Sequence, residues 1–351
     1  MTANETEVYA ENVFLCFPLR LDSCLSAQRL TAVKAAMYIL MLLIIFLTVF
    51  GNLLVVVSIS YFKHLQSPTH LIVQSLAACD CLLGSLVMPY SMVRSIEGCW
   101  YLGDTICKVH SSLDMTLSIS SKMHLSLISM DRYWAICDPL MYKTRVTNYS
   151  ITVFIMCAWL FAFVYSFSIV FSEVNLIGLE LLVLQMSCLG SCVLLFNKPL
   201  ALVCSVLTFF LPGAIMSSLY VKIFHVASKH AKVLSERVSV LEIKTQTYAQ
   251  RERKAAKIVA IVVGAFLLCW LPFFVATALD PFLNFWTPAD VFDALVWFGY
   301  FNSTCNPLIY GFFYPRFQKA FKILILRHVA PTNSASLVIQ MFLKATGMKG
   351  F

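Results

Sequence analysis

Long apolar runs dominate the chain, and seven of them are long enough to cross a membrane as helices. About 20 apolar residues in a helix span a hydrocarbon core of about 30 Å. The runs are Ala35–Ser60, Ile72–Val93, Ile106–Trp134, Ile151–Phe171, Leu200–Phe224, Ala256–Leu279 and Val291–Phe313. A further apolar stretch, Leu176–Met186, is too short to span and contains Glu180, so we predict a loop there. The pattern predicts an all-α membrane protein built as a seven-transmembrane helix bundle.

Charged residues orient this bundle and divide the chain into three parts. Cytoplasmic loops carry the excess of Lys and Arg. The loops on one side, together with the C-terminal tail, hold 19 of the 26, whereas the side with the N-terminus holds six. We therefore expect an extracellular N-terminus (1–34), the bundle (35–314) and a cytoplasmic part (315–351). Basic and apolar residues in Arg316–Arg327 have the spacing of an amphipathic helix on the membrane surface.

The composition supports this class of protein and limits its partners. The chain is 60% apolar and 13% charged, whereas soluble domains carry about 25% charged residues. The predicted outer face holds 11 acidic and six basic residues, so it attracts cations. Topology and anionic lipid explain the basic inner face, so we expect a lipid bilayer and no nucleic acid as partner. Motifs of intramembrane enzymes, such as His-Glu-x-x-His and Gly-x-Ser-x-Gly, are absent from the sequence, and no enzyme is predicted.

Asp114 lies within the third run, two helical turns and about 10 Å below its outer end. An ionisable group at this depth is costly, so it needs a partner or a function. The third run offers no Lys or Arg within a turn of Asp114. The ammonium group of a small ligand is the expected partner. A protonated or water-solvated carboxyl in a polar cavity is the alternative.

Aromatic and hydroxyl side chains at a similar depth are predicted to complete a ligand site. Ring faces attract a desolvated cation, although rings at helical spacing can also serve packing alone. Hydroxyl groups on the third and fifth runs can bind a polar end of the ligand. The predicted ligand residues are Asp114, Met115, Ser118, Ser205, Thr208, Trp270, Phe273, Phe274, Trp297 and Tyr300.

A second acid, Asp80, lies deeper, in the second run. Side chains of other runs can supply oxygen ligands, which predicts a sodium ion acting as an allosteric modulator and no other cofactor. The predicted sodium residues are Asp80, Ser121, Asn302, Ser303 and Asn306. A purely structural hydrogen-bond network is the alternative.

Six of the 13 cysteines fall on the predicted outer side, the oxidising compartment. They are Cys16, Cys24, Cys99, Cys107, Cys188 and Cys192. A bridge between Cys107 and Cys192 would tether the loop before the fifth run over the mouth of the bundle, and Cys188 would then pair with Cys24 or Cys16. On the same side, Asn4 begins a sequon and is predicted to carry a glycan.

Five short motifs in order make residues 35–325 similar to the rhodopsin class of G-protein-coupled receptors. The motifs are Gly51-Asn52, Leu76-Ala-Ala-Cys-Asp80, Asp131-Arg132-Tyr133, Cys269-Trp270-Leu271-Pro272 and Asn306-Pro307-Leu308-Ile309-Tyr310. Within this class, Asp114 matches the amine-anchoring aspartate of the aminergic branch. The stretches Met88–Arg94, Cys188–Cys192 and Asn302–Pro315 resemble the trace amine-associated receptors.

The resemblance implies a plasma-membrane receptor for trace or volatile amines, with an olfactory role. It also implies coupling to a stimulatory heterotrimeric G protein that raises cyclic AMP, and disulfides Cys107–Cys192 and Cys24–Cys188. In the implied mechanism, ligand acts on Asp114 and Trp270, the sixth helix swings outward and Arg132 is released. The implied activation residues are Asp131, Arg132, Tyr133, Lys122, Pro212, Phe266, Asn306, Pro307 and Tyr310.

Lys122 departs from the class, which has an aliphatic residue there that packs against Pro212 and Phe266. A lysine at this position can disable signalling, make the receptor constitutively active or reach Asp114, about 12 Å away along the helix. A receptor that binds amines without signalling is therefore the alternative function. A transporter is a second alternative, but the sequence has neither internal repeats nor interrupted helix pairs.

Overall fold

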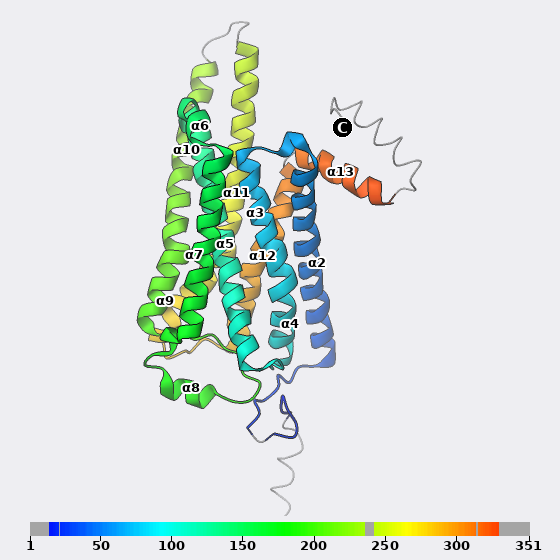
Figure 1. Cartoon of the computed structure of the whole chain (residues 1–351), viewed down its shortest axis with the longest axis vertical. Coiled ribbons are helices and arrows are strands. Elements are labelled where there is room, and N and C mark those ends of the chain that lie inside the picture. Colours follow the sequence, from blue (N-terminus) through cyan, green and yellow to red (C-terminus); the bar gives the residue numbers. More distant parts are fainter. Residues whose placement is uncertain (1–13, 21, 236–241, 314, 330–351) are drawn as a thin grey trace, which may run out of the picture.

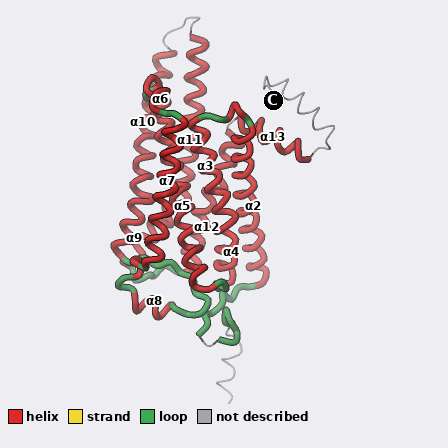
Figure 2. The backbone as a smooth tube through the Cα atoms, in the orientation of Figure 1, coloured by secondary structure: helices red, strands yellow, loops and turns green. Residues whose placement is uncertain are grey.

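The computed structural model describes residues 14–20, 22–235, 242–313 and 315–329 as a bundle of long helices (Figure 1 and Figure 2). The long elements line up as seven rods within these residues, in the order that the apolar runs predict. Their helices are α2 (Thr31–Tyr61), α3 (Pro68–Leu82), α4 (Met88–Glu97), α5 (Gly103–Cys137), α7 (Asn148–Ser172), α9 (Lys198–Ser205), α10 (Leu211–Ser235), α11 (Glu242–Leu279) and α12 (Ala289–Phe313).

Two rods are interrupted by a single π-helical turn. The turn η2 (Leu83–Val87) joins α3 to α4, and the turn η4 (Val206–Phe210) joins α9 to α10. A π turn inserts an extra residue into the helix and so rotates the side chains beyond it; such turns often occur at functional sites. The predicted ligand residue Thr208 lies within the second turn.

The bundle buries polar side chains among its apolar core and exposes many large apolar side chains on its outer surface. Among the described residues, five rods have the length and composition of a membrane span: Thr31–Tyr61, Pro68–Glu97, Asn148–Ser172, Lys198–Val226 and Ala260–Phe282. The other two predicted spans, α5 and α12, bury many polar side chains, among them Ser112, Ser120, Asn302 and Thr304. These side chains face neighbouring helices, since α5 packs against α3, α7 and α10, and α12 against α2 and α11. Low hydropathy in α5 and α12 therefore reflects their place inside the bundle.

Short helices lie at both ends of the bundle. The stretch Leu176–Met186, predicted as a loop, contains the short helix α8 (Glu180–Met186), so that prediction was wrong in this detail. Its seven residues are too few to span a membrane, and α8 lies across one end of the bundle (Figure 1). The helix α6 (Pro139–Arg145) lies at the opposite end.

The helix α13 (Pro315–Val329) contains the stretch predicted to be amphipathic and leaves the bundle sideways (Figure 1). Four buried residues, Phe317, Ala320, Ile323 and Leu324, recur at helical spacing along it. The positions between them include the exposed residues 318, 319 and 322. The helix therefore has one apolar face, which lies against α2 and α12.

Candidate functional site

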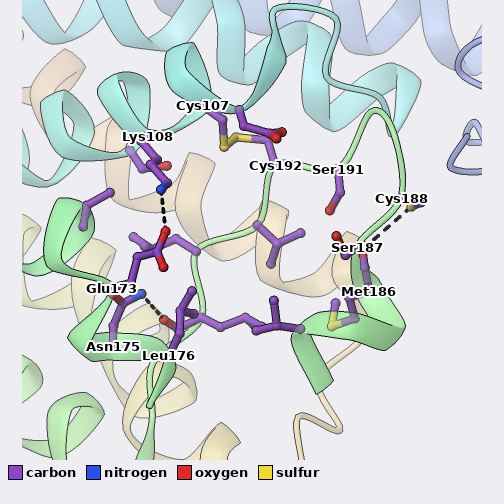
Figure 3. Close-up of a pocket in the computed structure, with 17 residues that line it drawn as sticks. Cys107, Lys108, Glu173, Asn175, Leu176, Met186, Ser187, Cys188, Ser191 and Cys192 are labelled. Carbon is purple, nitrogen blue, oxygen red and sulfur yellow. Dashed lines mark hydrogen bonds and ion pairs between the residues drawn. A yellow bond between two sulfur atoms is a disulfide. The ribbon is translucent and has the colours of Figure 1, made fainter. Parts of the chain in front are cut away.

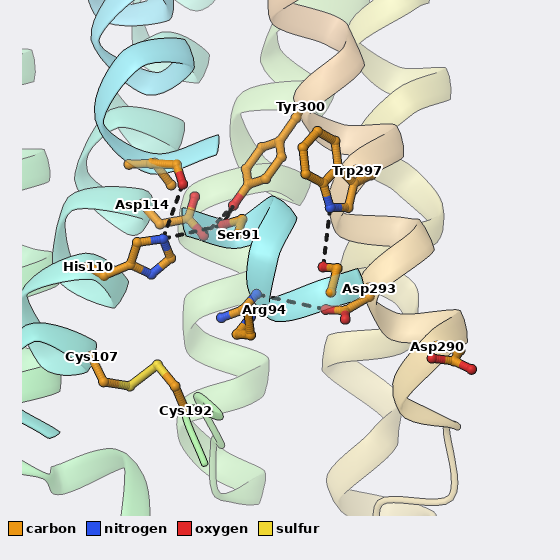
Figure 4. A network of polar contacts seen from close by, with 12 residues as sticks. Ser91, Arg94, Cys107, His110, Asp114, Cys192, Asp290, Asp293, Trp297 and Tyr300 are labelled. Atoms are coloured by element: carbon orange, nitrogen blue, oxygen red, sulfur yellow. Dashed lines mark hydrogen bonds and ion pairs between the residues drawn. A yellow bond between two sulfur atoms is a disulfide. The ribbon is translucent and has the colours of Figure 1, made fainter. Parts of the chain in front are cut away.

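Asp114 lies on α5 in the interior of the bundle and is half-buried. The hydroxyl of Tyr300, from α12, donates to Asp114 Oδ2 at 2.7 Å, and Ser118, one turn further along α5, donates to Oδ1 at 3.3 Å (Figure 4). Both donors are neutral, and no ion pair joins Asp114 to a described Lys, Arg or His. The carboxylate is thus oriented by its neighbours without being neutralised by them.

The predicted aromatic rings form two groups, of which the first lies beside Asp114 (Figure 4). In the first, Trp297 meets Tyr300 edge-on at 5.6 Å between ring centroids. In the second, Trp270, Phe273 and Phe274 pack together with centroids 5.2–5.8 Å apart. Both groups converge on α12, because a Cβ at Gly299 would lie only 2.7 Å from the Trp270 ring. A glycine at this position therefore lets the indole lie directly against the backbone of α12.

The remaining predicted ligand residues differ in whether their polar groups are already hydrogen-bonded within the protein. Ser118 contacts Asp114, whereas Met115, Ser205 and Thr208 make no hydrogen bond to it. Thr208 donates its hydroxyl to the backbone of Cys204 at 2.7 Å. The hydroxyl of Ser205 is buried and has no hydrogen-bond partner among the described residues, so it remains available to a ligand.

The sequence reasoning did not predict a set of polar contacts between Asp114 and the outer end of the bundle. Ser91, on α4, lies 3.3 Å from the Tyr300 hydroxyl and 3.3 Å from His110 Nε2, so it links both to the site (Figure 4). Closer to the outer end, Arg94 forms an ion pair with Asp293 at 3.7 Å. Polar residues within the second apolar run could have indicated these contacts from the sequence. Their partners, however, depend on how the helices face one another.

Asp80 has a complete set of partners deeper in the bundle. Its carboxylate accepts hydrogen bonds from Ser121 at 2.9 Å, Ser303 at 2.8 Å and Asn306 at 2.7 Å. Asn302, also predicted to bind sodium, is buried and makes no hydrogen bond to Asp80 among the described residues, so its role at this site stays a prediction. Asn306 Oδ1 is buried without a described hydrogen-bond partner. The carboxylate, the two hydroxyls and this amide oxygen form an oxygen-rich donor set that fits a hard cation such as sodium.

At the opposite end of α5, Asp131 forms an ion pair with Arg132. Arg132 Nε donates to Asp131 Oδ2 at 2.9 Å, and Thr69 and Tyr142 each donate to the same carboxylate at 2.9 Å. Burial, reinforced by the charge of Asp131, raises the pKa of Tyr142, which therefore remains protonated and able to donate. The neighbouring Tyr133 packs beside Ile136.

The other predicted activation residues connect neighbouring helices. Phe266 of α11 packs against Phe209 of η4, with ring centroids 5.4 Å apart, and Pro212 follows that turn. Pro307 lies so close to Gly51 of α2 that a Cβ there would meet its ring at 2.8 Å. The Tyr310 ring stacks on Phe317 of α13 at 5.9 Å. The last contact links the end of α12 to the lateral helix.

Lys122 is buried against the aromatic group of Trp270 and Phe274, with 3% of its surface exposed. Its Nζ lies 4.0 Å from the ring centroid of Trp270 and 4.8 Å from that of Phe274. Nζ makes no hydrogen bond or ion pair with any residue that the structure describes, so Lys122 does not pair with Asp114. The lysine therefore contacts the same rings that are predicted to surround a ligand.

Three disulfides join the outer segments. Cys107–Cys192 and Cys24–Cys188 are present, as the resemblance implies, with Cα atoms 5.7 and 5.1 Å apart. The third, Cys16–Cys99, was not predicted and attaches the N-terminal segment to the residues after α4. Asn4 lies outside the described residues.

A pocket of about 230 Å³ lies beneath the loop that Cys192 tethers (Figure 3). It is lined by the outer end of α5, the residues after α7 and the tethered loop itself. Lys108 and Glu173 form an ion pair across its side. Asp114 is not among its lining residues, so this outer pocket is separate from the site around Asp114.

Known proteins with similar sequences agree with the motifs and the architecture. Residues 51–310 match the family described as 7 transmembrane receptor (rhodopsin family). The chain is 45% identical to trace amine-associated receptor 4 of Rattus norvegicus, covering 93% of this chain and 96% of that receptor. It is 48% identical to trace amine-associated receptor 2 of Mus musculus, over 90% and 92% of the two chains. Identity to trace amine-associated receptor 1 of Homo sapiens is 44%, over 89% and 94%.

Proposed function

The chain belongs to the trace amine-associated receptors of the rhodopsin family, and we propose that it binds a small amine and activates a stimulatory G protein, raising cyclic AMP. It is a multi-pass receptor of the plasma membrane and not an enzyme. We place its role in olfaction, with volatile amines as ligands. The three relatives compared above are trace amine-associated receptors, and their names support an amine as the ligand class.

The state of Asp114 is the observation that carries this proposal. A half-buried carboxylate with two neutral donors and no cation has capacity for one more charge-assisted hydrogen bond. An ammonium group supplies both the positive charge and the donor. The rings of Tyr300 and Trp297 lie close together beside this position and add cation–π attraction.

Signalling requires that ligand binding change the contacts of Arg132, at the far end of α5. The contacts of Arg132 with Asp131 and Thr69 suit a resting receptor, because they hold the guanidinium against α3 and α5. An agonist activates only if it binds better to the state in which Arg132 is released. Trp270 and Phe266, packed on α11 below the site, are the residues through which we expect α11 to respond.

Cyclic AMP measured in cells that express the chain and receive a panel of volatile amines tests this function. We expect Asp114→Asn to weaken the response about 100-fold, since it removes the charge of a hydrogen-bonded anchor. Glu173→Gln is the matched control, because this acid lies at the outer surface, half-exposed beside Lys108. An equal effect of both substitutions, at equal surface expression, would contradict Asp114 as the anchor. Expression in olfactory sensory neurons is the measurement for the olfactory role.

A receptor that binds amines without signalling is the second candidate, favoured by the position of Lys122 over Trp270. The distinguishing result is amine binding with no change in cyclic AMP, restored to a response by Lys122→Leu. Uptake of the amine into the cell would instead indicate a transporter.

A further inference from the structure

The outer pocket beneath the tethered loop is a space that the proposed amine site does not use (Figure 3). Its lining residues on α5 are Asp104, Cys107, Lys108 and Ser111. They lie on one face of the helix, because they recur every three or four positions. Asp114 follows one turn further along α5 but does not line the pocket. On this helix the pocket therefore ends at Ser111, short of the amine anchor.

The loop side of the pocket presents apolar side chains that the protein leaves partly uncovered. The helix α8 supplies Val183 and Met186, and none of the residues of α8 is buried. Met186 is 38% exposed, and Val193, on the tethered loop, is 55% exposed. Covering such side chains with another apolar group is favourable, because it removes their surface from water. The pocket therefore suits a ligand with an apolar body.

The polar groups of the pocket differ in charge and in depth. Lys108 Nζ and Glu173 Oε1 lie 2.5 Å apart at its side, so these two charges balance each other, and Asp104 is exposed to water. Ser111 and Asn175, by contrast, are buried, with 7% and 3% of their surface exposed. The Ser111 hydroxyl and Asn175 Oδ1 have no hydrogen-bond partner among the described residues. The buried polar groups left for a ligand are therefore neutral.

The size of the pocket limits what can enter it. Its volume is about 230 Å³. At the packing density of protein interiors, about 0.74, this space holds a molecule of about ten nonhydrogen atoms. A sterol or a phospholipid is much larger, so the pocket selects a small molecule.

We infer that the outer pocket is a second ligand site, which binds a small neutral amphiphile such as an aliphatic alcohol. The hydroxyl of the ligand hydrogen-bonds with Ser111, and its chain packs against Val183, Met186 and Val193. An ammonium group is disfavoured, because it would lose its water without gaining an unpaired buried carboxylate. The site does not depend on Asp114, so it stands or fails independently of the proposed amine function.

Photolabelling tests the site in the full chain, purified into lipid nanodiscs. The probe is hexanol that carries a diazirine ring, and mass spectrometry of the digested receptor locates the labelled peptides. We expect labelling within 183–195 and in the outer turns of α5 that excess heptanol suppresses. Probe dissolved in the bilayer labels lipid-facing helices instead, such as α2, and heptanol leaves that labelling unchanged.

Substitutions at Ser111 and in the loop give this experiment its resolution. Ser111→Ala should raise the heptanol concentration for half suppression about 5-fold, since it removes one hydrogen bond. Ser112→Ala is the matched control and should change nothing: its hydroxyl donates to the backbone of Lys108 at 2.8 Å, and it does not line the pocket. Val193→Trp fills the pocket and should abolish the suppressible labelling. Met186→Trp is the second filling variant, in case Val193→Trp does not fold.

The melting temperature of each variant verifies that it folds, and four outcomes overturn the inference. The first is a folded parent without labelling that heptanol suppresses. The second is a folded filling variant that retains such labelling. The third is heptylamine that suppresses it as well as heptanol does, whereas we expect heptylamine to be at least 10-fold weaker. The fourth is suppression lost in Asp114→Asn, which would mean that heptanol binds at the amine site. Suppression that persists in Asp114→Asn supports a separate site, whether or not amines raise cyclic AMP.

Discussion

Asp80 and Lys122 are both ionisable and both buried inside the bundle, yet their surroundings differ. Asp80 accepts three hydrogen bonds from α5 and α12, whereas Lys122 Nζ, among the described residues, makes no hydrogen bond or ion pair and lies over the faces of two aromatic rings. One charge is stabilised by groups that the fold itself provides, and the other lies in an apolar environment. The comparison shows that burial alone is a poor indication of a ligand site. A buried charge without partners in the fold is a better one.

Asp114 stands between these two cases. It has two neutral donors, fewer than Asp80, and it is half-buried rather than fully enclosed. Tyr300 and Ser118 orient it, and it forms no ion pair with a described residue. Such an arrangement suits a group that must bind a cation reversibly, because a built-in ion pair would compete with the ligand.

Removal of the Asp80 carboxylate is expected to have the largest effect on stability. Asp80→Leu leaves two hydroxyls and an amide without their acceptor, at a cost of about 1–3 kcal/mol for each buried group. The apparent melting temperature of the purified receptor should fall strongly. Asp80→Asn, which preserves the shape and one acceptor oxygen, should cause a smaller fall. Equal stability of Asp80→Leu and the parent would mean that the network contributes nothing to the fold.

Replacing Lys122 is expected to change stability in the opposite direction. Lys122→Leu removes a buried charge that has only ring partners, and we expect the free energy of unfolding to rise by about 1–3 kcal/mol. The same melting experiment measures it, with Lys108→Leu as the control at the surface. A lower melting temperature for Lys122→Leu would show that the ammonium has a stabilising partner, and the contrast with Asp80 would then be lost.

Sodium is expected to have the smallest effect, and it tests whether the Asp80 network is also an ion site. We propose that Na⁺ binds Asp80, Ser121, Ser303 and Asn306. Replacing potassium chloride with sodium chloride at constant ionic strength should then raise the melting temperature by a few degrees, equivalent to about 1 kcal/mol. Asp80→Asn should abolish the difference between the salts. An identical response in the parent and in this variant would leave the network purely structural.

The sequence predicted the architecture well, because the features that specify it are local. Helix length and hydropathy can be read along one run at a time, and all seven predicted spans fall on long helices of the structure. It also pointed to Asp114 as a candidate ligand residue, since the cost of a charge depends on its depth in the membrane, which is predicted from its distance to the end of the run; this role stays a prediction. The two disulfides implied by family resemblance are likewise present.

Contacts between helices could be predicted only in part. Asn302 and Ser303 are adjacent in the sequence, but only Ser303 reaches Asp80, because successive residues point about 100° apart around a helix. The pairing of Cys16 with Cys99 depends on the path of the N-terminal segment, which no periodicity encodes. The same holds for Ser91, which joins His110 and Tyr300 from three different helices.

By itself, then, the sequence determined the membrane class and the family, and it predicted the orientation in the membrane and the depth of each buried charge. The tertiary structure alone decided which of those charges have partners within the described part of the chain: Asp80 accepts three hydrogen bonds, Asp114 is oriented by neutral donors without an ion pair, and Lys122 lies on Trp270 without a hydrogen bond or ion pair. The physical reason is that hydropathy and helical spacing act along one segment. The partner of a side chain, by contrast, is set by the rotation and packing of several segments against one another.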